Sequence, residues 1–99
     1  MENKVIMGTK PTIKAILKSI DAFLCLKLLR VPPFKIDTDS VPGVAFIFSR
    51  EDFYAMILIG NDMTLLAEAK ANGEWIDICH GPIKLHRLIY AVNQIKKLY

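Results

Sequence analysis

The dipeptide Asn72-Gly73 lies between two segments in which apolar and polar residues alternate. Asn-Gly is the strongest short signal for a two-residue type I′ β-turn, because both central residues of that turn adopt positive φ angles. A turn of this length also fixes which residues of the joined strands face each other. The sequence therefore predicts these facing pairs: Ala71 with Glu74, Lys70 with Trp75, Ala69 with Ile76, Glu68 with Asp77, and Ala67 with Ile78.

Two further segments before this hairpin have the composition of strands. Gly43–Ser49 is a short run rich in aromatic and β-branched residues, which are typical of strands. Tyr54–Ile59 is apolar throughout, and we favour a buried strand because its length matches one. A three-turn helix is the alternative, since Ser49 and Asp52 could form a capping box and Gly60 could end the helix.

A helix is expected on each side of the strands. The segment 12–30 contains no Gly or Pro, Thr9 or Thr12 can cap its start, and Pro32-Pro33 forces its end. After Gly81-Pro82, apolar residues recur at spacings of three and four, which indicates a second amphipathic helix. Its expected inner stripe is Leu85, Leu88, Ile89, Val92, Ile95 and Tyr99.

The order of these segments indicates the fold class. We expect an α+β two-layer sandwich: an N-terminal helix, a three- to four-stranded antiparallel meander, and a C-terminal helix packed on one sheet face. Both helices should share that face. Segment 31–43, with three prolines, is expected to be an extended surface connection. The 99 residues fit one domain, 1–99.

Composition excludes several classes of protein. Apolar residues make up 53% of the chain, which excludes intrinsic disorder. No apolar run approaches the ~18–20 residues that a membrane-crossing helix requires, and the N-terminal residues do not resemble a secretory signal. We therefore expect a cytoplasmic protein without a membrane partner. Small orphan domains of this size are common products of viruses and mobile elements, in which case the location would be the host cytoplasm.

Two groups of residues invite a chemical interpretation that we do not favour. Asp37 and Asp39 match a phosphotransferase loop, but the hairpins around them do not supply the parallel sheet that such a loop needs, so an Asx-turn is expected. Cys79, His80 and His86, with Cys25 distant, lack the spacing of a zinc site. We expect no metal and no cofactor, and free thiols are the default with a single disulfide as the alternative.

Charge is distributed unevenly along the chain. Residues 1–35 carry seven Lys or Arg and two acids, residues 36–81 carry two and eight, and residues 82–99 carry four and none. The helices are therefore basic and the sheet is acidic. A basic helix layer is typical of nucleic-acid binders, although an ordinary solvated face is the simpler interpretation. The candidate contacts are Lys10, Lys14, Lys18, Lys84, Arg87 and Lys97.

The polar face of the hairpin is a second candidate site. Like charges that face each other on a sheet cost stability, so Glu68 opposite Asp77 requires compensation. Lys70 over the Trp75 ring would form a cation–π pair. These four residues are candidates for contact with a partner protein, and a small enzyme that uses Glu68 and Asp77 is a remote alternative; a solvated face is again the simpler interpretation.

Apolar surface exceeds what two layers can cover. Residues 23–29 are apolar nearly all round the helix, and Tyr54–Ile59 is apolar on both faces. A second copy of the chain is the simplest cover, which predicts a homodimer with Phe23, Leu26, Met56 and Ile57 at its interface. The favoured function is a small non-enzymatic dimeric binding or accessory protein, with sequence-nonspecific nucleic-acid binding as the alternative.

Overall fold

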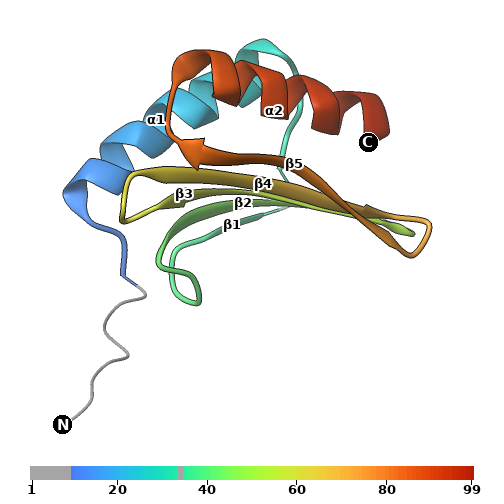
Figure 1. The fold of residues 1–99 in the computed structure, drawn as a ribbon, viewed down its shortest axis with the longest axis horizontal. Helices are drawn as coiled ribbons and strands as arrows, with labels where there is room; N and C mark the ends of the chain where they lie inside the picture. Colours follow the sequence, from blue (N-terminus) through green and yellow to red (C-terminus); the bar gives the residue numbers. More distant parts are fainter. Residues whose placement is uncertain (1–9, 34) are drawn as a thin grey trace, which may run out of the picture.

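The protein is an antiparallel sheet with two helices on one face (Figure 1). The computed structural model describes residues 10–33 and 35–99. Its elements are α1 (Ile13–Leu28), β1 (Lys35–Asp37), β2 (Gly43–Arg50), β3 (Phe53–Gly60), β4 (Thr64–Ala71), β5 (Glu74–Pro82) and α2 (Leu85–Leu98). The strands pair in sequence order. The α+β class and the shared helix face are confirmed, but the strands number five and not three to four. Of the predicted domain 1–99, residues 1–9 and residue 34 lie outside the described part.

The additional strand lies in the segment expected to be a surface connection. In β1, Ile36 pairs with Phe46 of β2. The connection after β1 is the expected Asx-turn: one Asp37 carboxylate oxygen accepts hydrogen bonds from the backbone N–H groups of Asp39 and Ser40, at 2.9 and 3.2 Å. Three residues are too few to show a strand period, so sequence patterning does not reveal β1.

Local hydrogen bonds define both ends of α1. Thr12 is the N-cap, and its side-chain oxygen accepts a hydrogen bond from the Ala15 N–H at 3.1 Å. Thr9, the other candidate cap, lies outside the described residues. At the C-terminus, Arg30 adopts a left-handed φ of 59°. The Val31 N–H donates to the Leu26 carbonyl at 2.9 Å, which completes a Schellman motif before the two prolines.

The predicted hairpin is confirmed at its turn. Asn72 and Gly73 have φ angles of 53° and 82°, as a type I′ turn requires. The expected pairs hold from Ala71 with Glu74 to Glu68 with Asp77. The last pair is wrong, because a β-bulge places Cys79, and not Ile78, opposite Ala67. Residues 54–59 belong to β3, which confirms a strand there.

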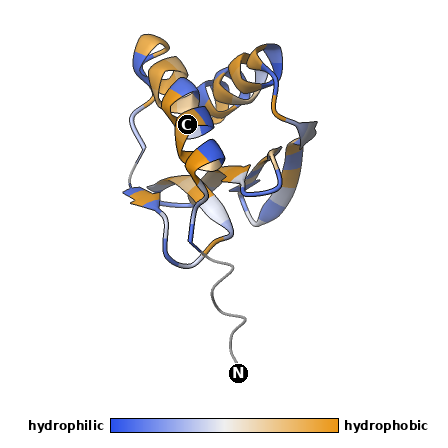
Figure 2. Cartoon of the chain, turned by 90° about the vertical axis from the view of Figure 1, so that its left-hand side faces the viewer, coloured by the Kyte–Doolittle hydropathy of each residue, from blue (hydrophilic) through white to orange (hydrophobic). Residues whose placement is uncertain are grey.

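The core lies between the sheet and the two helices, which Figure 2 shows side by side above it. From α1 the core receives mainly small side chains, including Ala15, Ser19 and Ala22. From α2 it receives Leu88, Ala91, Val92 and Ile95. The expected inner stripe of α2 is therefore partly wrong, because Leu85 and Ile89 are exposed. In the described ranges, neither helix has the length and apolar character needed to cross a membrane.

The turn geometry makes Gly73 sensitive to substitution. We expect Gly73→Val to lower the free energy of unfolding by about 1 kcal/mol or more, because a β-branched residue is strained at positive φ. Gly73→Asn is the matched control, since Asn tolerates this region better. Space is not the cause, because a Cβ at Gly73 would meet no atom within 4 Å. Urea unfolding of the two variants tests this, and equal stability to the unmodified chain would contradict it.

Candidate functional site

The most prominent surface feature is an apolar stripe on the side of α1 that faces away from the sheet. We call it the α1 outer stripe, and its side chains are 42–81% exposed. Its members are Ile13, Ile16, Leu17, Ile20, Phe23, Leu24 and Leu28. Figure 2 shows hydrophobic residues, in orange, along this helix. Because an α-helix turns by 100° per residue, these positions lie opposite Ala15 and Ala22, which are fully buried.

The predicted dimer residues lie in three different places. Phe23 belongs to the α1 outer stripe, and Met56 is half-buried on the sheet face away from the helices. Leu26 and Ile57 are 1% and 0% exposed and belong to the core. A partner therefore reaches Phe23 and Met56 but not Leu26 or Ile57. The expectation for these two is corrected, because each packs between the helices and the sheet.

The second candidate surface is the open sheet face, defined as the side chains that point away from the helices. Ile47, Met56, Leu58 and Leu66 form its half-buried apolar centre. At its edge, the Lys70 ammonium lies 5.6 Å from the centre of the Trp75 ring, which is the expected cation–π geometry. Tyr54 meets the same ring edge-on at 6.2 Å. Trp75 is nevertheless 59% exposed.

The facing carboxylates of Glu68 and Asp77 lie on this open sheet face. They line a shallow hollow of about 420 Å³ together with Leu66, Trp75, Ile76 and His80. Their facing positions in β4 and β5 agree with the predicted register. The hollow is open to solvent, whereas small-molecule sites usually enclose most of their ligand. The hollow therefore does not enclose a small ligand.

The environment of Tyr54 on the open sheet face is electrostatically distinctive. Burial among neighbouring side chains raises the pKa of the Tyr54 phenol, and the negative charges of Glu68 and Asp37 raise it further. Both causes disfavour the phenolate, the first by removing water and the second by repulsion. The phenol therefore keeps its proton, and its ability to donate a hydrogen bond, to a higher pH than an exposed tyrosine.

The basic candidates lie on the helix layer but do not form one cluster. Lys10, Lys14, Lys18, Lys84 and Lys97 are all exposed. Lys84 and Lys97 lie at opposite ends of α2, about 20 Å apart at 1.5 Å per residue. The Arg87 side chain points toward β5, where its guanidinium lies on Gly81. A Cβ added at Gly81 would lie 2.7 Å from the Arg87 Nη1 atom. Its Nε is buried without a hydrogen-bond partner among the described residues.

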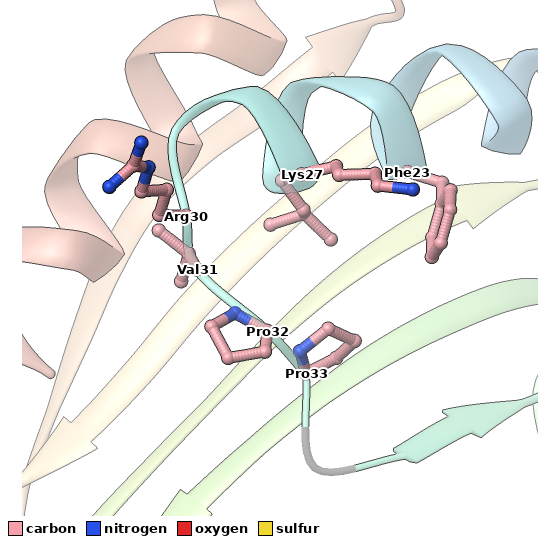
Figure 3. A pocket seen from close by; sticks show the side chains of 7 residues that line it. Phe23, Lys27, Arg30, Val31, Pro32 and Pro33 are labelled. Atoms are coloured by element: carbon pink, nitrogen blue, oxygen red, sulfur yellow. The ribbon is translucent and has the colours of Figure 1, made fainter.

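A smaller pocket lies beneath the C-terminal end of α1 (Figure 3). It measures about 260 Å³ and is almost entirely apolar, with Phe23, Val31, Pro32 and Pro33 in its lining. Two cations stand at its rim, Lys27 and Arg30. Figure 3 shows their side chains pointing in opposite directions. They do not converge on one point, so the pocket does not have the geometry of an anion site.

The cysteines were considered above as a disulfide pair and as metal ligands together with the histidines. Cys25 and Cys79 are both free thiols. Burial raises the pKa of the Cys25 thiol, with a further contribution from the negative charge of Asp21, so this thiol is a weak nucleophile at neutral pH. Within residues 10–33 and 35–99, no three His, Cys, Asp or Glu side chains are grouped to hold a metal ion.

Comparison with known proteins adds no assignment for either surface. No family model, curated protein sequence or solved structure matches this chain. The surfaces themselves are therefore the evidence for function.

Sequence reasoning missed the first half of the α1 outer stripe. It identified the polar side of this half-helix, with Lys14 and Lys18, and overlooked the apolar residues Ile13, Leu17 and Ile20. A signal was present, because these residues recur at spacings of four and three while small residues occupy the opposite side. In such a helix the side with small residues can pack against the sheet, which leaves the side with large apolar residues exposed.

The raised pKa of Tyr54 has a direct optical consequence. Ionised tyrosine quenches a neighbouring indole, and Trp75 is the single Trp of the chain. We expect its fluorescence to fall only above the ordinary tyrosine pKa. Glu68→Gln should move the pH midpoint of this fluorescence decrease to lower pH, because it removes a repulsive charge. Tyr54→Phe should abolish the decrease. Asp77→Asn is the control and should shift the midpoint less. If Glu68→Gln leaves the midpoint unchanged, the electrostatic cause is refuted.

Proposed function

We propose that this chain is a small non-enzymatic binding protein that functions as a homodimer and acts through its surfaces. The observation that carries this proposal is the α1 outer stripe, in which seven large apolar side chains are at least 42% exposed. Contiguous apolar patches beyond a few hundred Å² mark interaction sites in soluble proteins. Among residues 10–33 and 35–99 nothing covers this stripe, since the sheet occupies the opposite side of α1.

A second copy of the chain is the proposed cover for this stripe. Most soluble oligomers are symmetric homo-oligomers, and a two-fold dimer brings the same patch of both copies together. Fully burying one Leu or Ile side chain is worth about 1.5–3 kcal/mol, so covering several half-exposed ones favours association. Of the charges on α1, Lys14 and Asp21 flank the middle of the stripe with opposite signs and do not oppose self-contact there, and Lys27 lies at its C-terminal end.

The open sheet face is the proposed contact surface for a further partner protein. Trp75 is an exposed aromatic residue at the edge of an apolar patch, and Trp is enriched among residues that dominate binding energy. Glu68, Lys70 and Asp77 would form a polar rim. This face stays accessible when α1 is covered, because the two surfaces lie on opposite sides of the sheet (Figure 1).

Sequence-nonspecific nucleic-acid binding is the second candidate function. It is favoured by the exposed cations of the helix layer, Lys10, Lys14, Lys18, Lys84 and Lys97. Their spread along both helices suits contact with a phosphate backbone better than contact with a single small anion. Arg87 is removed from this set, because its guanidinium lies on β5.

The homodimer is tested by placing a charge in the stripe. We expect Ile20→Glu to convert the dimer to monomer, because a charge in an apolar interface is desolvated without a partner. Ile20 is 50% exposed, so the monomer should fold normally by circular dichroism. Ser49→Glu adds the same side chain on the open sheet face and should remain dimeric. Light scattering after gel filtration gives the masses. A concentration-independent monomer mass for the unmodified chain at micromolar concentration would refute the proposal.

Nucleic-acid binding is tested by its salt dependence. Each lysine that contacts a phosphate of duplex DNA adds about 0.9 to the slope of log K against log salt, so Lys18→Gln and Lys97→Gln should each lower the slope by about that amount. Lys70→Gln, on the open sheet face, is the control and should leave it unchanged. Absence of a gel shift with duplex DNA, single-stranded DNA and RNA at ~50 mM salt would eliminate this function.

A further inference from the structure

The α1 outer stripe has the spacing of a coiled-coil seam. Ile13, Leu17, Ile20 and Leu24 are separated by four, three and four residues, which corresponds to alternating d and a positions of a heptad. They are 49–77% exposed. Ala15 and Ala22 occupy the f positions of the same heptads and are buried against the sheet. The seam therefore points directly away from the sheet, where another helix can lie along it.

The residues beside the seam distinguish parallel from antiparallel packing. Lys14 and Asp21 occupy the e positions, and Ile16 and Phe23 occupy the g positions. In a parallel pair, g positions face e positions, which would set the Asp21 carboxylate against Ile16 of the other copy. In an antiparallel pair, e faces e and g faces g. Lys14 of each copy then faces Asp21 of the other, and Ile16 faces Phe23.

We infer that two copies of this chain pack α1 against α1 in antiparallel orientation, with Ile13 beside Leu24 of the other copy and Leu17 beside Ile20. This arrangement rests on the proposed homodimer and adds its orientation and register. Two-fold symmetry repeats every contact, so the dimer contains the pairing of Lys14 with Asp21 twice. The result is a four-layer stack of sheet, helices, helices and sheet.

The second helix extends the same contact. α2 lies beside α1 on the same side of the sheet (Figure 2). It exposes Leu85, Ile89 and Tyr90, which are 62%, 40% and 52% accessible. A copy that covers α1 approaches these side chains as well. Together the two helices provide apolar area toward the roughly 800 Å² per partner of a typical specific interface.

Charge exchange tests the register. At low salt we expect Lys14→Glu and Asp21→Lys to weaken the dimer about three- to tenfold each, because each places like charges together twice. The double variant Lys14→Glu/Asp21→Lys should return the dissociation constant to within about twofold of the unmodified chain. Lys18→Glu, which lies outside the e and g positions, is the control and should have a smaller effect. A double variant as weak as the single variants overturns the inferred pairing.

Disulfide trapping tests the orientation independently. In a Cys25→Ala/Cys79→Ala background, chains with Ile13→Cys and chains with Leu24→Cys carry tags of different length and are mixed. Antiparallel packing predicts a bond between unlike chains, because residues 13 and 24 of one helix are about 16 Å apart and like positions are therefore out of reach. A dimer that bonds only like chains, or that does not bond at all, overturns the orientation but leaves the proposed homodimer standing. A monomeric unmodified chain overturns both.

Discussion

The packing of α1 on the sheet is the contact on which the rest of the structure depends. It is possible because the inner side of the helix carries Ala15, Ser19 and Ala22, which are all buried. The Ser19 hydroxyl donates to the Ile16 carbonyl at 2.6 Å, so the one polar group at this contact is satisfied within the helix. With these small residues inside, the large apolar side chains of α1 other than Leu26 occupy its other sides. The exposed stripe is thus a consequence of how the helix packs.

Those features of the fold that depend on a few neighbouring residues could be predicted from the sequence. The Asn72-Gly73 turn and the end of α1 before Pro32 are set by local backbone preferences. The bulge at Ile78 could not be predicted, because it depends on both Ile78 and Cys79 packing on the core. Likewise, Ala91 faces the sheet in place of Ile89, a rotation of α2 that apolar spacing alone does not determine.

The candidate site was partly predictable for a related reason. An excess of apolar surface can be read from composition, but the accessible residues depend on which way each side chain points. In β3 every residue from Ala55 to Ile59 is apolar, so no alternation indicates that Ile57 faces the helices and Met56 faces away. Leu26 has the same ambiguity within a half-helix that is apolar nearly all round. The polar face of the hairpin was predictable because its alternation is clear.

A helix that is apolar on two opposite sides belongs in an inner layer of a structure, since each side requires something to pack against. In this chain the sheet supplies the layer beneath α1, and the described residues supply nothing above it. The charges of α1 leave most of this side uncovered, because Lys14, Lys18 and Asp21 lie to one side of the stripe and Lys27 lies at its C-terminal end. An isolated chain therefore resembles part of a larger stack of layers, in which the outer side of α1 would form a second core against the next layer.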